Sequence, residues 1–194
     1  MKKLFWLPLI AVTLFSTGCS TNNCKKGELT FELPNFSLNT EYTTPGTIYS
    51  KGPAAVIDQI TYQSGQKSFG SGKIVNTTAY SFGSGQMIRM NNTVLNFDFR
   101  SGTTKAEFEY LDQGGTINLG AHGWANLYVG SMYNMPASMV INGVTITKSN
   151  VKDHFASPGV KSAETGVITL TFYQDIGSLV IGGQEMYLDN FCFN

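Results

Sequence analysis

Hydrophobic and polar positions alternate with a period of two along most of the chain beyond residue 27. A β-strand places successive side chains on opposite faces, so each such run predicts a strand with one buried and one solvated face. No stretch beyond residue 18 repeats with the 3.6-residue period of an amphipathic helix. The clearest runs cover residues 29–33, 95–99, 106–110, 168–172, 179–181 and 186–188.

The Asn142-Gly143 dipeptide gives the clearest turn. It separates residues 139–141 from residues 144–146, two short runs rich in β-branched side chains. Asn and Gly tolerate the positive φ that both central positions of a type I′ hairpin turn require. Glycine and serine punctuate the other gaps. About ten short strands without intervening helices predict an all-β fold, an antiparallel β-sandwich or jelly roll.

The first 18 residues follow a different pattern. A basic start precedes an apolar run from Leu4 to Phe15, which has the length of the central region of a secretory signal and is too short to cross a bilayer. Ser16-Thr17-Gly18-Cys19 then resembles the lipobox of bacterial lipoproteins, with Ser where the family usually has Leu. The resemblance implies cleavage before Cys19 and lipidation of its thiol. The alternative is an ordinary secretory signal followed by an incidental cysteine.

The lipobox resemblance also implies a domain organisation. Residues 1–18 are the signal peptide, residues 19–27 form a lipidated tether, and residues 28–194 form the β-sandwich domain. Ser20 and Thr21 follow the cysteine, whereas acidic residues there retain members of the family at the inner membrane. We therefore expect an outer-membrane lipoprotein, with the side of the membrane left open.

Charge restricts the possible partners. The chain has 13 basic and 13 acidic residues, and charged residues make up 13% of it. A neutral chain with scattered lysines lacks the positive surface that nucleic acid requires. Its length is that of a single domain that can bury its own core. We expect a monomer that binds no nucleic acid.

Two cysteines remain once Cys19 carries lipid. Cys24 and Cys192 lie at opposite ends of the predicted domain, and an even pair in an oxidising compartment predicts a disulfide. Such a bridge requires the first and last strands to lie side by side. In the alternative, Cys192 is buried and Cys24 stays in the tether without pairing.

Aromatic residues gather in one polar stretch. Trp124, Asn126 and Tyr128 share a face if the segment is extended, and Tyr133 follows shortly after them. Sugars stack their C–H faces on aromatic rings, and their hydroxyls bond amide side chains, so this set suits a carbohydrate. The same pattern also suits a strand that packs into the core.

The terminal runs carry a second resemblance. Phe31-Glu32 in the first run and Asp189-Asn190 in the last are similar to the end strands of galactose-binding-like jelly rolls and related carbohydrate-binding modules. The resemblance implies a structural calcium ion held by Glu32 and Asp189, because calcium takes oxygen ligands of this kind. Otherwise the two carboxylates are surface or hydrogen-bonded groups.

The sequence patterns that would indicate a catalytic site are weaker than those that indicate a binding site. Glu107 and Glu109 lie about 7 Å apart if on one strand face, near the carboxyl separation of glycoside hydrolases, and Asp112 follows in a turn. A solvated strand face explains the same residues. Neither His122 nor His154 has a second ligand at zinc spacing.

The sequence therefore predicts a membrane-anchored, exported, non-catalytic binding domain whose ligand is a carbohydrate. The first alternative is an envelope lipoprotein with a structural or protein-interaction role. The second is a small glycan hydrolase that uses Glu107 and Glu109.

Overall fold

A computed structural model of the protein describes residues 27–32, 34–76, 80, 83, 85–121 and 124–194, without the side chains of residues 124–126. The described chain forms antiparallel strands and one short 3-10 helix, η2, so the predicted all-β antiparallel sandwich is confirmed. The elements are β1 (Gly27–Leu29), β2 (Glu41–Tyr42), β3 (Gly46–Tyr49), β4 (Ala54–Thr61), β5 (Lys67–Ser68), β6 (Ser71–Asn76), β7 (Gln86–Asn91), β8 (Thr93–Asp112), β9 (Ile117–Ala121), β10 (Trp124–Gly130), η2 (Met132–Asn134), β11 (Ser138–Ile141), β12 (Val144–Ser157), β13 (Val160–Gly183) and β14 (Met186–Phe193).

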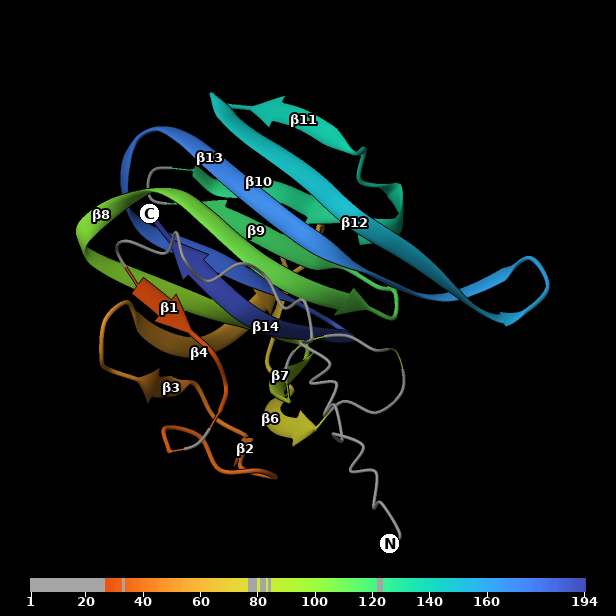
Figure 1. Ribbon diagram of the computed structural model, residues 1–194, viewed down its shortest axis with the longest axis horizontal. Coiled ribbons are helices and arrows are strands. Elements are labelled where there is room, and N and C mark those ends of the chain that lie inside the picture. The colour runs from red at the N-terminus through yellow and green to blue at the C-terminus, as the bar shows by residue number, and fades with distance from the viewer. Residues whose placement is uncertain (1–26, 33, 77–79, 81–82, 84, 122–123) are drawn as a thin grey trace, which may run out of the picture.

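Two long strands, β8 and β13, take part in both layers of the sandwich (Figure 1). The first half of β8 and the second half of β13 lie in one layer, in the order β3-β4-β8-β13-β9-β10. Their other halves lie in the second layer, in the order β11-β12-β13-β8-β14-β7-β6-β2. The two layers are therefore joined by continuous strands.

The runs at 95–99 and 106–110, expected as separate strands, belong to the single strand β8. Between them Gly102 has a φ of 68°, a backbone conformation that glycine adopts without steric cost. In β13 the register with β8 shifts at Thr171, Ile176 and Ser178. Such irregularities bend a strand while its pairing continues, so a break in the alternation does not end the strand.

The apolar core lies between the two layers, where alternate residues of the strands point inward. Leu95, Phe97 and Phe99 are buried while Asp98 and Arg100 are exposed, as the alternation predicted. Phe191 lies at the centre of an aromatic cluster. Its ring centroid is 4.8 to 6.2 Å from those of Phe31, Phe97, Phe108 and Phe193.

The hairpin predicted at Asn142-Gly143 is confirmed. Ile141 pairs with Val144 across it, and the two central residues have φ angles of 51° and 79°. Both values are positive, as a type I′ turn requires.

The first and last strands lie side by side, as expected. β1 pairs antiparallel with β14 over three positions, from Gly27 opposite Phe193 to Leu29 opposite Phe191. β14 continues past β1 to pair with β7, and its other edge pairs with β8. The last eight strand residues are thus enclosed by strands on both sides.

The hairpin between β12 and β13 projects from the body as a two-stranded ribbon, at the right of Figure 1. We call residues 150–163 the ribbon. β13 pairs with β8 only from Glu164 onward, and β11 pairs with β12 only up to Thr147. No helix within the described ranges has the length and apolar character that crossing a membrane needs.

Candidate binding surface at the end of the sandwich

A polar network closes one end of the apolar core. Along the inward face of β8, buried Ala106 and Phe108 are followed by Tyr110 and Asp112. Glu164 of β13 lies directly opposite Asp112 in the register and is only 2% exposed. Two carboxyl groups therefore occupy positions that apolar side chains hold elsewhere in the core.

Glu164 is the centre of this network. The Tyr110 hydroxyl donates to its Oε1 at 2.5 Å, the Lys148 ammonium donates to Oε1 at 2.9 Å, and the Lys161 ammonium donates to Oε2 at 2.6 Å. Burial alone would raise the pKa of the carboxyl, but these hydrogen bonds outweigh it and hold the pKa below its ordinary value. Glu164 is therefore a fully partnered buried anion.

Lys148 links the short helix η2 to the network through hydrogen bonds. Besides Glu164, its buried ammonium donates to the backbone carbonyl of Met132 at 2.9 Å. The Ser131 hydroxyl accepts the backbone N–H of Tyr133 at 3.2 Å and caps the start of η2. The position of Tyr133 is thus set by bonds from two directions.

Asp112 joins η2 to the turn after β8. Its Oδ1 accepts the backbone N–H of Gly114 at 2.9 Å, and the backbone of Met132 also donates to the carboxyl. Its Oδ2 is buried and has no hydrogen-bond partner among the described residues. Burial raises the pKa of Asp112 to about 6, because the two backbone bonds offset only part of the desolvation.

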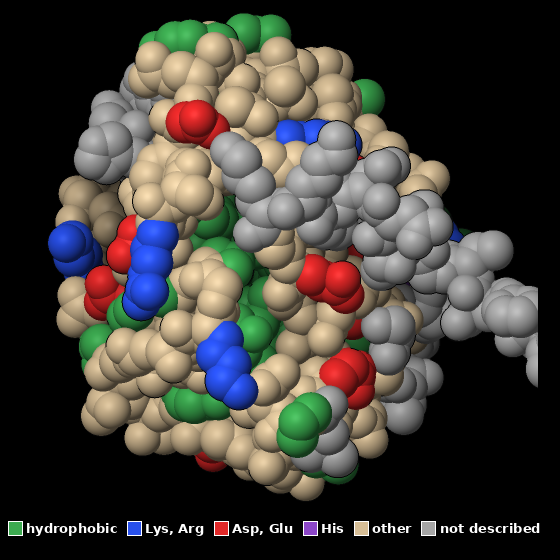
Figure 2. Space-filling view, turned by 60° about the vertical axis from the view of Figure 1, so that its left-hand side comes forward, with side chains coloured by type: hydrophobic (Ala, Val, Ile, Leu, Met, Phe, Trp, Pro, Cys, Tyr) green, Lys and Arg blue, Asp and Glu red, His purple; other side chains and the backbone are tan. Residues whose placement is uncertain are grey.

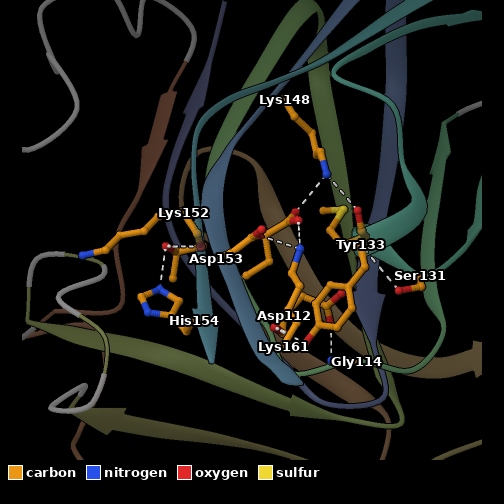
Figure 3. A network of polar contacts seen from close by, with 12 residues as sticks. Asp112, Gly114, Ser131, Tyr133, Lys148, Lys152, Asp153, His154 and Lys161 are labelled. Atoms are coloured by element: carbon orange, nitrogen blue, oxygen red, sulfur yellow. Dashed lines mark hydrogen bonds and ion pairs between the residues drawn. The ribbon is translucent and has the colours of Figure 1, made fainter. Parts of the chain in front are cut away.

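Tyr133 lies at the outer side of the network, beside Lys161 (Figure 3). Its hydroxyl donates to the backbone carbonyl of Asp112 at 3.3 Å, and the Lys161 ammonium lies 4.4 Å from the centre of its ring. A cation at this distance attracts the electron-rich ring face. Burial and the nearby Asp112 raise the pKa of Tyr133 to about 12.

Of the four residues predicted to bind carbohydrate, the structure brings Tyr128 and Tyr133 to the surroundings of Asp112. The Tyr128 hydroxyl donates to the Ser131 carbonyl at 2.8 Å, and its ring packs against the core. The side chains of Trp124 and Asn126 lie outside the described residues, although both backbones belong to β10.

The ribbon supplies three further side chains that the sequence patterns did not single out. Lys161 pairs with Asp153 at 2.6 Å as well as with Glu164. Phe155 lies across from Lys161 in the strand register and is 57% exposed. The alternation of polar and apolar residues did not mark these side chains in the sequence. Register shifts at Phe155 and near Ser149 change which side chains share a face of the ribbon.

His154 points to the other side of the ribbon. Its ring lies 4.6 Å from that of Tyr80, and its Nε2 is 3.1 Å from the Thr165 hydroxyl. Burial and the neighbouring Lys152 lower its pKa, with Asp153 acting in the opposite direction. His122, the second histidine, lies outside the described residues.

Glu107 and Glu109 lie on the outward face of β8, between β13 and β14. Glu107 is 3.5 Å from the Lys105 ammonium and accepts the Thr169 hydroxyl at 3.1 Å. Neither lines the two cavities whose walls consist of described residues. The hydrolase alternative therefore finds no support in these two cavities and stays a prediction.

Glu32 and Asp189 both lie against the turn before β7. Glu32 Oε1 accepts the backbone N–H of Gln86 at 2.6 Å, and a Cβ on Gly85 would meet the same oxygen. A Cβ on Gly83 would lie 2.7 Å from Asp189 Oδ2. Within the described ranges, no group of three His, Cys, Asp or Glu side chains is arranged to hold a metal ion. The calcium site stays a prediction that rests on two carboxylates beside one turn.

The predicted modification sites fall at the start of the chain. Residues 1–18, Cys19 and Cys24 lie outside the described residues, so the signal peptide, the lipidation and the bridge to Cys192 stay predictions.

Comparison with known proteins found no match for this chain. No protein-family model, curated protein or solved structure matches the chain. The function must therefore be argued from the site itself.

Proposed function

We propose that this chain is a membrane-anchored, exported binding domain, without catalysis of its own, whose ligand is a carbohydrate. The binding surface lies where η2 meets the ribbon, and we call the side chains of Tyr133, Asp153, Phe155 and Lys161 the ribbon surface. The observation that carries the proposal is the fixed position of Lys161 between two carboxylates and the ring of Tyr133.

The chemistry of the ribbon surface suits a sugar. Phe155 offers an exposed ring for the C–H face of a pyranose, and Asp153 and Lys161 offer an acceptor and a donor for its hydroxyls. The network orders Asp153 and Lys161 before a ligand arrives, which lowers the entropic cost of binding. Trp124 and Asn126 remain candidates for this site on their sequence pattern alone, because their side chains lie outside the described residues.

A glycan array probed with the full chain tests the proposal. We expect Phe155→Ala and Tyr133→Ala to remove most of the binding, and Trp124→Ala to weaken it. Tyr173→Ala is the matched control, because Tyr173 is an exposed aromatic residue, 66% accessible, elsewhere on β13. Equal binding by Phe155→Ala and wild type, or no bound glycan at all, would overturn the proposal.

The ribbon also favours a second candidate, a protein partner. Val151, Phe155 and Val160 are 45, 57 and 55% exposed, and an apolar group on a projecting element is typical of interaction sites. Val151→Asp and Val160→Asp separate the two functions. Loss of glycan binding only in the Phe155 and Tyr133 variants favours the sugar, whereas a wild-type chain that binds no glycan favours the partner.

A further inference from the structure

A hollow lies at the opposite end of the sandwich from the ribbon surface. β8 begins at Thr93, bends near Gly102 and returns to end at Asp112, and β4 pairs with its first half so that Ala54 lies opposite Asp98, close to the bend. β3 lies on the outer edge of β4, with Tyr49 opposite Ala55. Figure 2 turns this end toward the viewer and shows a hollow with hydrophobic side chains at its floor and charged side chains around it.

The cavity beside β3 has a volume of about 350 Å³. Its walls are the turn after β1 and the strand β3 with the residues that follow it: Pro34, Asn35, Thr47, Ile48, Tyr49, Ser50 and Lys51. This volume lies at the small end of the range for ligand sites and is sufficient for a single sugar ring. A register shift between Thr47 and Tyr49 marks a bulge in β3, a feature that re-aims side chains at the edge of a sheet.

The ring of Tyr49, which lines this cavity, is fixed by stacking on a buried ring. Phe36, which is buried, stacks on Tyr49 with ring centroids 5.8 Å apart and planes 26° apart. Phe36 in turn packs edge-on against Phe31, with centroids 5.1 Å apart. An aromatic ring that is fixed from behind by the core makes a rigid platform for the apolar face of a ligand.

The polar side chains of the cavity are available to a ligand. Across the described part of the chain, those of Asn35, Thr47, Ser50 and Lys51 make no hydrogen bond or ion pair with another residue. Lys51 is also the one charged residue among the lining residues. An amide, two hydroxyls and one ammonium around an aromatic ring match a ligand with several hydroxyls and one negative charge.

We propose that this cavity binds one acidic sugar residue, a uronic acid. Its carboxylate lies against Lys51, its ring lies on Tyr49, and its hydroxyls meet Asn35, Thr47 and Ser50. This site is separate from the ribbon surface and uses none of its residues, so each proposal can fail without the other.

Titration calorimetry with methyl glycosides of glucuronic and galacturonic acid tests the inference, with methyl glucoside and methyl galactoside as neutral probes. We expect the full chain to bind a uronide and Lys51→Gln to bind it at least about tenfold more weakly, since the substitution removes the charge from one hydrogen bond. Lys67→Gln is the matched control, because Lys67 is an exposed lysine of β5 outside the cavity. Added salt weakens the wild-type binding, because it screens an exposed charge pair.

Two further variants keep the two sites apart. Tyr49→Leu weakens uronide binding, whereas Phe155→Ala leaves it unchanged. No uronide binding by wild type, or equal binding by wild type and Lys51→Gln, would overturn the inference. Loss of uronide binding in Phe155→Ala would place the ligand on the ribbon surface instead and would also overturn it.

Discussion

Glu28 of β1 lies directly opposite Cys192 of β14. Cys24 precedes Glu28 by four residues, so a Cys24–Cys192 disulfide would need only this short length of chain to reach across. We expect a disulfide between Cys24 and Cys192 in exported protein. Non-reducing peptide mapping checks this, and recovery of both cysteines as free thiols would exclude the bridge.

Removing either partner of the buried Lys148–Glu164 ion pair should destabilise the fold, but by different amounts. Glu164→Gln leaves the Lys148 ammonium buried without its counter-charge, so we expect a loss of about 3–5 kcal/mol in unfolding free energy. Lys148→Met costs less, because Tyr110 and Lys161 still hold Glu164.

Denaturant unfolding of both single variants and of the double variant measures the coupling between Lys148 and Glu164. Glu107→Gln is the control, because its partner Lys105 is 43% exposed and solvent-accessible pairs contribute at most about 1 kcal/mol. Equal effects of Glu164→Gln and Glu107→Gln would show that the network does not stabilise the fold.

The raised pKa of Asp112 leads us to expect that this group stabilises the fold as the pH falls. Its pKa is raised to about 6 in the folded protein, from an ordinary value of 3.8, so the folded state binds its proton more tightly than the unfolded state. Through this group, the unfolding free energy rises as the pH falls from about 6 towards 4. Glu164 has the opposite effect. Its pKa is lowered, so its contribution is present above the ordinary value of 4.5 and is lost as the pH falls through the folded pKa.

Unfolding measured between about pH 4 and 7 in wild type and Asp112→Asn tests this assignment. The amide keeps an acceptor for Gly114 and Met132 but does not titrate, so we expect a flatter profile in the variant. Carbon NMR of the Asp112 carboxyl gives the pKa directly in wild type. A carboxyl that titrates near its ordinary value would contradict the prediction.

Phe191 is expected to be among the most sensitive core positions. It contacts aromatic residues from β8, from β14 itself and from the segment after β1, so Phe191→Ala leaves a cavity among several elements. The expected loss of unfolding free energy is about 3–5 kcal/mol. Tyr173→Ala, at an exposed aromatic residue, should change stability by less than about 0.5 kcal/mol. Comparable losses in the two variants would contradict the packing described here.

Calcium should stabilise the fold if Glu32 and Asp189 are its ligands. A ligand that binds only the folded state raises the melting temperature by mass action. We expect calcium to raise the melting temperature of wild type, chelator to reverse the rise, and Glu32→Gln or Asp189→Asn to abolish it. Glu28→Gln, which alters an exposed carboxylate of β1, should keep the full rise. A wild-type protein that responds to neither calcium nor chelator would remove the calcium site.

The fold was predictable because each local pattern agreed with the global structure. Leu95, Phe97 and Phe99 alternate with polar residues, and Asn142-Gly143 specifies its own turn chemistry. The continuity of β8 was not predictable, because the alternation breaks between residues 99 and 106 while the strand continues through a bend at Gly102.

The candidate site was predictable only in part. Tyr133 stood out because it is an aromatic residue in a polar segment. The network that holds it joins Asp112, Lys148 and Glu164, which come from three strands and meet only when the sheet forms. Each of these residues alone resembles a solvated charge, so no local pattern could assign them to the core.

The central place of β14 has a consequence for how the chain folds. β14 lies far along the chain from β1, yet it pairs with β1, β7 and β8 and carries Phe191 into the core. Contacts between such distant parts of a chain form slowly, because the entropic cost of closing the loop arises before the contacts can stabilise the fold. A nascent chain that lacks β14 has an unfilled gap inside its second layer. The second layer therefore stays incomplete until β14 has been synthesised, and a chain truncated before β14 is open to aggregation and proteolysis.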